Sequence, residues 1–172
     1  MEKADLSHHI LSRFNADLER VRTNVLQMGG LVEEQLANAV QALVNGDTAA
    51  ADRVVSNDPR VNAMEVSIDE DCNRILATRS PAASDLRLIV AVIKTITDLE
   101  RIGDEAEKIG YIGSRLAAME RPLDRYREIK HLGHAVEQML HHALDAFARL
   151  DADAALEAAK RDRMVDEEYE AI

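Results

Sequence analysis

Apolar residues recur every three or four positions along most of this chain. In the first segment they stand at Leu18, Val21, Val25, Met28, Val32, Leu36, Ala39 and Leu43. This spacing places them on one face of an α-helix, because a helix turns once in about 3.6 residues. Glycine and proline, which interrupt helices, number only 7 and 3 in 172 residues. The pattern predicts an all-α fold and disfavours a β-sandwich or barrel, which needs frequent turns.

Turn signals divide the chain into separate helices. Asn45-Gly46-Asp47 combines a glycine that ends one helix with an aspartate that caps the next. At Asn57-Asp58-Pro59 an N-cap precedes a proline, so we expect the second helix to bend or restart there. Gly29-Gly30, inside the first helix, indicates a kink or a close helix crossing. With breaks at Ser80–Ser84 and Arg121–Asp124, the expected helices cover about residues 6–45, 48–77, 85–119 and 126–150, and a fifth follows Asp151.

An internal repeat organises these helices. A shift of 104 residues aligns Gly29–Ile68 with Gly133–Ile172 without a gap, and 12 of the 40 aligned positions are identical. The first copy continues into a third helix, whereas the sequence stops at Ile172, inside the second helix of the second copy. We therefore expect residues 1–120 to form a three-helix bundle and residues 121–172 to form the first two helices of a second, incomplete bundle. Such a hairpin would expose an apolar face that a longer chain or another copy must cover.

Charge and composition exclude several classes of function. The formal net charge of −11 would repel a nucleic-acid backbone, so DNA and RNA are not expected partners. Cys72 is the only cysteine, which excludes a disulfide framework and fits a reducing cytoplasm. The longest strongly apolar run, Leu88–Ile93, is far shorter than the roughly 20 residues that span a bilayer. Any membrane contact is expected to be peripheral, through a partner.

Two pairs of acidic residues are candidate metal ligands. Glu65 and Asp69 lie four apart on the second helix, and Glu100 and Asp104 lie four apart on the third, so each pair shares one helical face. Glu65 is 16 residues before Pro81, and Asp98 is 17 residues after it. If the two helices are antiparallel, the two acidic pairs therefore lie at similar levels along the helix axes. Four converging carboxylates would suit Mg²⁺, Mn²⁺, Ca²⁺ or iron, which prefer oxygen ligands.

The same acidic residues have a simpler interpretation as a solvated surface. Pairs at this spacing occur about as often as chance allows in a chain with 32 acidic residues. Only the phase of Glu100, which lies beside Ile93, Ile96 and Gly103 at the edge of the apolar stripe, favours a metal site. Both interpretations stay open at this point.

Other motifs point weakly to an enzyme. Glu128-x-x-His131 occurs once, whereas di-iron bundles use the motif twice. A carboxylate-bridged, metal-dependent oxidase is nevertheless the alternative function that we retain. His134, His141 and His142 are expected on the helix surface, with a metal site there as the less favoured alternative. No glycine-rich loop follows a strand, which excludes a nucleotide-dependent enzyme, and Cys72 is expected in the core.

The sequence contains three longer motifs, which are Ser7-His8-His9-Ile10 with Phe14–Glu19, Pro81–Ile89, and Asp98-Leu99-Glu100-Arg101-Ile102-Gly103-Asp104-Glu105-Ala106. Together they resemble the PhoU family, the accessory and regulatory proteins of phosphate-specific transport systems. Ala143–Phe147 extends the resemblance into the second repeat. The family fold is two three-helix bundles in tandem, which agrees with the internal repeat. Family members run on to a second Glu-Arg-Ile-Gly-Asp helix, which this sequence lacks.

The resemblance implies a non-enzymatic, cytoplasmic regulator. Such a protein would regulate phosphate uptake and repress the phosphate-starvation response, bridging the ATPase subunit of a phosphate ABC transporter and a sensor histidine kinase. The family's Glu-x-x-x-Asp motif falls on Glu100 and Asp104, with Glu65 and Asp69 as partner acids, for a divalent or trivalent ion such as Mg, Mn, Fe or Zn. In the second repeat, Asp166 and Glu170 would lack a facing helix. We also expect a homo-oligomer.

Overall fold

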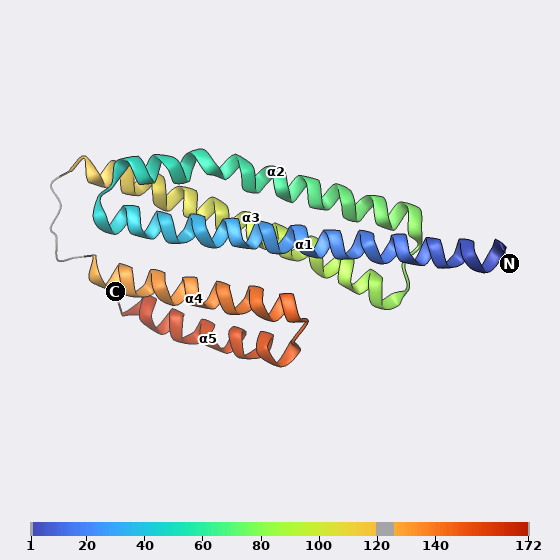
Figure 1. The fold of residues 1–172 in the computed structure, drawn as a ribbon. Helices are drawn as coiled ribbons and strands as arrows, with labels where there is room; N and C mark the ends of the chain where they lie inside the picture. Colours follow the sequence, from blue (N-terminus) through green and yellow to red (C-terminus); the bar gives the residue numbers. More distant parts are fainter. Residues whose placement is uncertain (1, 120–125, 172) are drawn as a thin grey trace.

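The protein is a bundle of five α-helices, in which each helix runs antiparallel to the one before it in the chain, seen in a computed structural model (Figure 1). The structure describes residues 2–119 and 126–171, with side chains from Arg13 onwards. The helices are α1 (Glu2–Asn45), α2 (Thr48–Arg79), α3 (Ala83–Ala117), α4 (Arg127–Arg149) and α5 (Ala152–Glu170). No strand occurs in these described ranges, so the predicted all-α class is confirmed.

The helix boundaries agree with the sequence prediction except at Pro59. There α2 continues without interruption, so the expected restart is wrong. Proline removes one backbone hydrogen bond from a helix interior. Val54, Asp58 and Val61 are nevertheless all buried on the two sides of Pro59. Packing against α1 and α3 therefore holds the helix together across the defect.

Helices α1, α2 and α3 form the main core, and α3 packs against both others. The apolar stripe of α3, including Ile89, Val92 and Ile96, is completely buried. Glycines on α3 allow close approach: a Cβ added at Gly110 would lie 3.2 Å from the Ala51 carbonyl oxygen, and one at Gly113 would lie 3.3 Å from the Leu43 Cα. Helix α3 therefore packs closely against both α1 and α2.

The two repeats have the same hairpin turn. The side chain of Asp47 accepts a hydrogen bond from the Ala50 backbone N–H at 2.9 Å, and Asp151 accepts one from Ala154 at 2.9 Å. These are N-caps of α2 and α5 at aligned positions. The residue before each cap is in the left-handed region, with φ of 70° at Gly46 and 53° at Leu150. The repeat is thus a repeat of structure as well as of sequence.

The α4–α5 hairpin lies along α1 (Figure 1), and α4 makes the contact. A Cβ added at Gly29 of α1 would lie 2.5 Å from Leu144 Cδ2 of α4, whereas one at Gly30 would meet nothing within 4 Å. Of the two expectations for this glycine pair, the close helix crossing is confirmed, and it involves Gly29. At the edge of the same contact, His141 Nδ1 lies 2.8 Å from Glu33 Oε1.

Three sequence predictions concern residues outside the described ranges. The break at Arg121–Asp124 and the boundary between the two predicted bundles both fall there, so the division into 1–120 and 121–172 stays a prediction. The side chains of Ser7–Ile10 are not described either. Within the described residues, none of the helices combines the length and apolar character needed to cross a membrane.

Candidate functional site

A buried carboxylate marks the level at which α1, α2 and α3 meet. Asp58 of α2 is only 6% exposed. Its Oδ1 accepts a hydrogen bond from Gln35 Nε2 of α1 at 3.3 Å, and its Oδ2 accepts one from Asn62 Nδ2 at 3.1 Å. Gln35 Nε2 also donates to the Gly103 carbonyl of α3 at 3.3 Å. Among the described side chains no lysine or arginine forms an ion pair with Asp58, so amide groups alone hold this charge.

Three of the four predicted ligands lie around this buried group. The pKa of Glu100 is raised, first by burial and then by the negative charges of Asp104, Glu65 and Asp58. Glu65, Glu100 and Asp104 are all half-buried. The charge of Asp58, which sequence reasoning interpreted only as a helix cap, thus acts on Glu100 together with two of the predicted ligands, while the metal site itself stays a prediction.

Asp69 belongs to a different neighbourhood. Its Oδ2 accepts a hydrogen bond from Asn73 at 2.8 Å. Together with burial, which is the larger cause, and with Asp71, it raises the pKa of the buried Cys72 thiol to about 11. Asp69 is not among the charges that raise the pKa of Glu100. The fourth predicted ligand thus lies one helical turn from the cluster that the other three share.

Two buried oxygen atoms beside Asp58 have no hydrogen-bond partner among the described residues. They are Gln35 Oε1 and Asn62 Oδ1, each on a residue whose amide nitrogen donates to Asp58. An unpartnered buried acceptor costs about 1–3 kcal/mol, so it normally has an ion or water nearby. A signal for these residues existed in the sequence: Gln35 and Asp58 are polar residues in the phase of apolar stripes.

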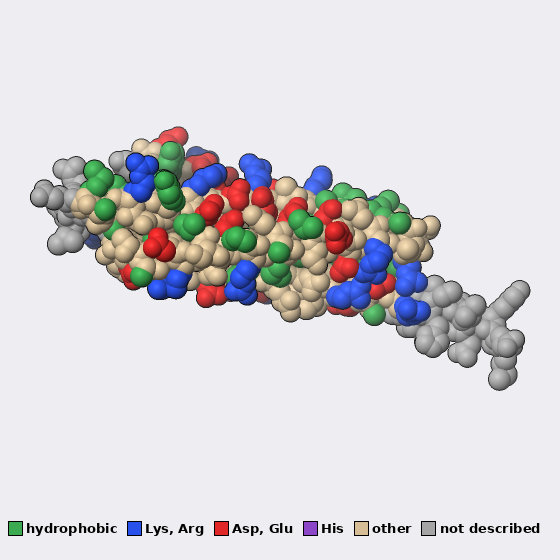
Figure 2. All heavy atoms as spheres, turned by 90° about the horizontal axis from the view of Figure 1, so that it is seen from above, with side chains coloured by type: hydrophobic (Ala, Val, Ile, Leu, Met, Phe, Trp, Pro, Cys, Tyr) green, Lys and Arg blue, Asp and Glu red, His purple; other side chains and the backbone are tan. Residues whose placement is uncertain are grey.

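The donor chemistry of the cluster suits a hard cation. Carboxylate and amide oxygens are the ligands of Mg²⁺, Ca²⁺ and Mn²⁺, and a cation would offset the repulsion that raises the pKa of Glu100. As the described side chains stand, however, no three His, Cys, Asp or Glu residues converge closely enough to hold one metal ion. Binding would require the half-buried acids to change rotamer. Figure 2 shows acidic side chains gathered along the middle of one face of the molecule.

The second repeat carries no equivalent cluster. Asp162 aligns with Asp58, and Asp166 aligns with Asn62, but both are exposed on α5, as is Glu170. His134 and His141 are exposed, as the sequence predicted, whereas His142 is half-buried. Acidic residues at the same spacing therefore differ in their exposure to solvent between the two repeats. In the first repeat α3 covers them, and in the second no described helix does.

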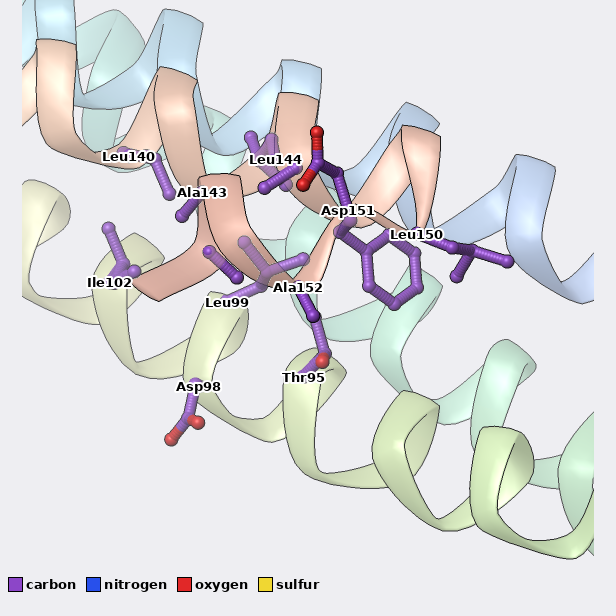
Figure 3. Close-up of a pocket in the computed structure, with 13 residues that line it drawn as sticks. Thr95, Asp98, Leu99, Ile102, Leu140, Ala143, Leu144, Leu150, Asp151 and Ala152 are labelled. Carbon is purple, nitrogen blue, oxygen red and sulfur yellow. The ribbon is translucent and has the colours of Figure 1, made fainter. Parts of the chain in front are cut away.

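A large apolar groove separates α3 from the α4–α5 hairpin (Figure 3). It has a volume of about 470 Å³, and most of its walls are apolar. Leu99 and Ile102 form the α3 side, and Leu140, Leu144 and Phe147 form the α4 side. Thr95, Asp98 and Asp151 are the polar residues that line it. With no cluster of titratable groups inside it, the groove is suited to packing and not to catalysis.

Comparisons with known proteins give one family. The PhoU domain model matches residues 25–112 and 129–172. A phosphate-specific transport system accessory protein PhoU homolog from Pseudomonas aeruginosa is 50% identical over 169 residues, which cover 98% of this chain and 70% of that protein. The phosphate-specific transport system accessory protein PhoU of Serratia marcescens is 51% identical over 173 residues, 100% of this chain and 70% of that protein. The crystal structure of PhoU from Pseudomonas aeruginosa has a TM-score of 0.89 and 51% identity, over 92% of this chain and 76% of that chain.

Proposed function

This chain belongs to the PhoU domain family, and we propose that it acts as an accessory protein of phosphate-specific transport. In the finer form of the proposal it regulates phosphate uptake and represses the phosphate-starvation response from the cytoplasm. It does so by bridging the ATPase subunit of a phosphate ABC transporter and a sensor histidine kinase. The observation that carries this proposal is the identity of about one residue in two, over nearly the whole chain, to proteins named for that accessory role.

Two exposed apolar pairs on α3 support a bridging role. Leu86 and Val90 are each 42% exposed near the start of the helix, and Tyr111 and Ile112 are 58% and 51% exposed near its end. Val90 and Tyr111 are 21 residues apart, which is about 30 Å at 1.5 Å per residue. Exposed apolar groups are characteristic of interaction surfaces. One rigid helix therefore presents two separate places at which two partners can bind without touching each other.

The bridging proposal is tested with purified transporter ATPase subunit and kinase. We expect the kinase to be retained on the immobilised ATPase subunit only when this chain is present. The double variants Leu86→Lys/Val90→Lys and Tyr111→Lys/Ile112→Lys should each abolish binding of one partner and leave the other. If the chain binds neither protein, or if the two compete for one surface, the bridging proposal is wrong.

The acidic cluster supports a second, separate proposal of metal binding. Glu65, Glu100 and Asp104 would hold one divalent or trivalent cation, with Asp58 and Asn62 behind them, and Asp69 remains the fourth predicted ligand. The cation, whether Mg, Mn, Fe or Zn, would supply positive charge that neutralises these acids. The residues themselves would tie α2 to α3 at this level. The unpartnered Asn62 Oδ1 and the raised pKa of Glu100 support this proposal.

Elemental analysis of matched variants tests the metal site. Glu100→Ala/Asp104→Ala should lose the bound metal, whereas Asp162→Ala/Asp166→Ala, which removes the same spacing from the exposed face of α5, should retain it. Asp69→Ala decides whether Asp69 is a ligand: loss of affinity by about tenfold or more would make it one. Equal metal content in all variants would leave the acids as a solvated surface. Oxygen consumption by an iron-loaded sample would instead favour the carboxylate-bridged oxidase.

Self-association is the third part of the proposal. Leu156 and Met164 of α5 are 62% and 65% exposed, whereas the aligned positions in α2 carry Asp52 and Arg60. We expect another copy to cover these two apolar residues in a homo-oligomer. Restoring charge with Leu156→Asp/Met164→Arg should give a monomer by analytical ultracentrifugation. A wild-type chain that is strictly monomeric at high concentration would contradict it.

A further inference from the structure

A second groove lies between α1 and the α4–α5 hairpin. Its volume is about 650 Å³, and its lining residues include Glu33 of α1 and His134, Glu137 and His141 of α4. The three residues of α4 are separated by three and four positions, so they lie on one face of that helix. This groove therefore combines imidazole and carboxylate groups, whereas the acidic cluster around Glu100 has only oxygen donors.

Each of these two histidines lies beside one glutamate. His141 Nδ1 is 2.8 Å from Glu33 Oε1, across the contact between α4 and α1. His134 Nδ1 is 3.6 Å from Glu137 Oε2, one turn further along α4. Two ligands of one tetrahedral zinc ion are about 3.3 Å apart, because each lies about 2.0–2.1 Å from the metal. Both pairs are thus already near the spacing of neighbouring metal ligands.

The two glutamates have no cationic side chain paired with them. Their side chains are 30% exposed at Glu33 and 26% exposed at Glu137, so both are partly withdrawn from water. Among the described side chains no lysine or arginine forms an ion pair with either one. Arg161 of α5 also lines the groove, but its Nη1 lies 3.2 Å from His142 Nδ1. A cation between the two glutamates would lower the cost of holding both negative charges in one groove.

The internal repeat places both glutamates on the same side of one helix crossing. A shift of 104 residues relates Glu33 to Glu137. Since α1 and α4 are aligned copies that pack against each other, aligned residues lie on equivalent sides of their contact. The same shift relates Ala37 to His141, and a Cβ added at Gly30 would meet nothing within 4 Å. The α1 side of the groove is therefore small and open, and the imidazoles come from α4.

We propose that this groove binds one Zn²⁺ ion through His141, Glu33 and Glu137, with water in the fourth position. Imidazole ligands favour Zn²⁺, Ni²⁺ and Cu²⁺, whereas Mg²⁺ and Ca²⁺ prefer oxygen ligands alone. As the described side chains stand, no three such groups converge on one point. Glu137 therefore turns from His134 toward His141, which is four residues further on the same face. The bound ion ties α4 to α1.

Zinc titration of the full 172-residue chain by isothermal calorimetry tests this site. The variant Glu100→Ala/Asp104→Ala is the background, because it removes any zinc bound at the acidic cluster. In this background we expect one saturable equivalent of Zn²⁺ with a Kd of about 1–100 μM. At this affinity dialysis removes the ion, so metal retained by the acidic cluster after dialysis is counted separately.

Substitution of each ligand shows where the zinc binds. In the same background His141→Ala, Glu33→Gln and Glu137→Gln should each remove the saturable equivalent, whereas His134→Ala should leave it in place. Co²⁺ gives a second readout, since its visible absorption is intense in a four-coordinate site. We expect this absorption in the background variant and its loss in His141→Ala.

Two matched variants test whether the binding is specific. His131→Ala removes an exposed histidine of α4 that does not line this groove, and Glu34→Gln removes the exposed charge next to Glu33. Both should bind Zn²⁺ as the background variant does. Circular dichroism confirms that every variant keeps its helical content.

Three results would overturn the proposal. The first is absence of a saturable zinc equivalent in the background variant. The second is equal weakening by His131→Ala and His141→Ala, because zinc would then adsorb to surface histidines in general. The third is loss of binding in His134→Ala without loss in Glu33→Gln, since the ion would then be held within α4 alone. None of these results depends on the transporter, the kinase or the acidic cluster.

Discussion

Gly133 of α4 lies directly against Val40 of α1, so that a Cβ added at Gly133 would stand 2.6 Å from the Val40 Cγ1. The repeat relates this contact to the one between Gly29 and Leu144, because each residue of one contact aligns with a residue of the other. The two helices therefore cross about a local two-fold axis, with one glycine from each at the closest approach. The two aligned copies of this segment thus pack against each other in a symmetric interface within one chain.

The crossing predicts opposite effects for two glycine substitutions. Gly133→Ala should destabilise the protein by about 1–3 kcal/mol, because the branched Val40 has little freedom to move. Gly30→Ala should stabilise it by about 0.5–1 kcal/mol, because that exposed position has open space and alanine is the better helix former. Urea unfolding measures both. Equal effects of the two substitutions would show that the crossing contributes nothing.

The raised pKa of Glu100 leads us to expect that the stability of the protein depends on pH. Its pKa is raised in the folded protein, so its ionisation opposes folding. This opposition is absent below the ordinary pKa of a glutamate, grows as the pH rises through the raised value, and is complete at neutral pH. In metal-free protein, Glu100→Gln should therefore raise the Tm near pH 7 and have a smaller effect near pH 4. A Tm difference that is the same at every pH would show that ionisation of Glu100 is not the cause.

Leu150 predicts a stabilising substitution at the α4–α5 turn. Its φ of 53° lies in the left-handed region, where a side chain costs about 1–2 kcal/mol and glycine costs nothing. Gly46, with φ of 70°, fills the aligned position of the first hairpin. Leu150→Gly should raise the unfolding free energy by about 1 kcal/mol, and Gly46→Leu should lower it by a similar amount. Thermal unfolding of the two variants should shift in opposite directions.

We expect the thiol of Cys72 to be unreactive in the native protein. The side chain is fully buried, and burial with the nearby Asp69 and Asp71 raises the thiol pKa to about 11. Only the thiolate reacts quickly with alkylating reagents, so the native protein should resist iodoacetamide at neutral pH. The unfolded chain should react at least about a hundredfold faster, since an exposed cysteine has a pKa of about 8.5. Mass spectrometry counts the modified chains, and rapid modification of the native protein would place Cys72 outside the core.

The candidate metal site was only partly predictable from the sequence. The register of α2 against α3 explains why Asp69 does not lie with the other three predicted ligands. Gly103 of α3 lies against Val61 and Asp58 of α2. The two helices run in opposite directions. Asp69, four residues after Glu65, and Asp104, four residues after Glu100, therefore lie in opposite directions along the bundle axis. Asp69 therefore separates from Asp104, and Asp58 takes its place. Residue spacing on single helices predicts which side chains share a face, but pairing across helices depends on register.

The sequence by itself determined the all-helical class, the helix limits and the repeated hairpin, because these follow from periodicity and capping within a few turns of chain. Only the tertiary structure decided that α2 continues through Pro59, that Asp58 is a buried charge, and that aligned acids are covered in one repeat and exposed in the other. Those outcomes depend on contacts between helices far apart in the chain. Burial by a neighbouring helix changes the free energy of a charge far more than its position along its own helix does.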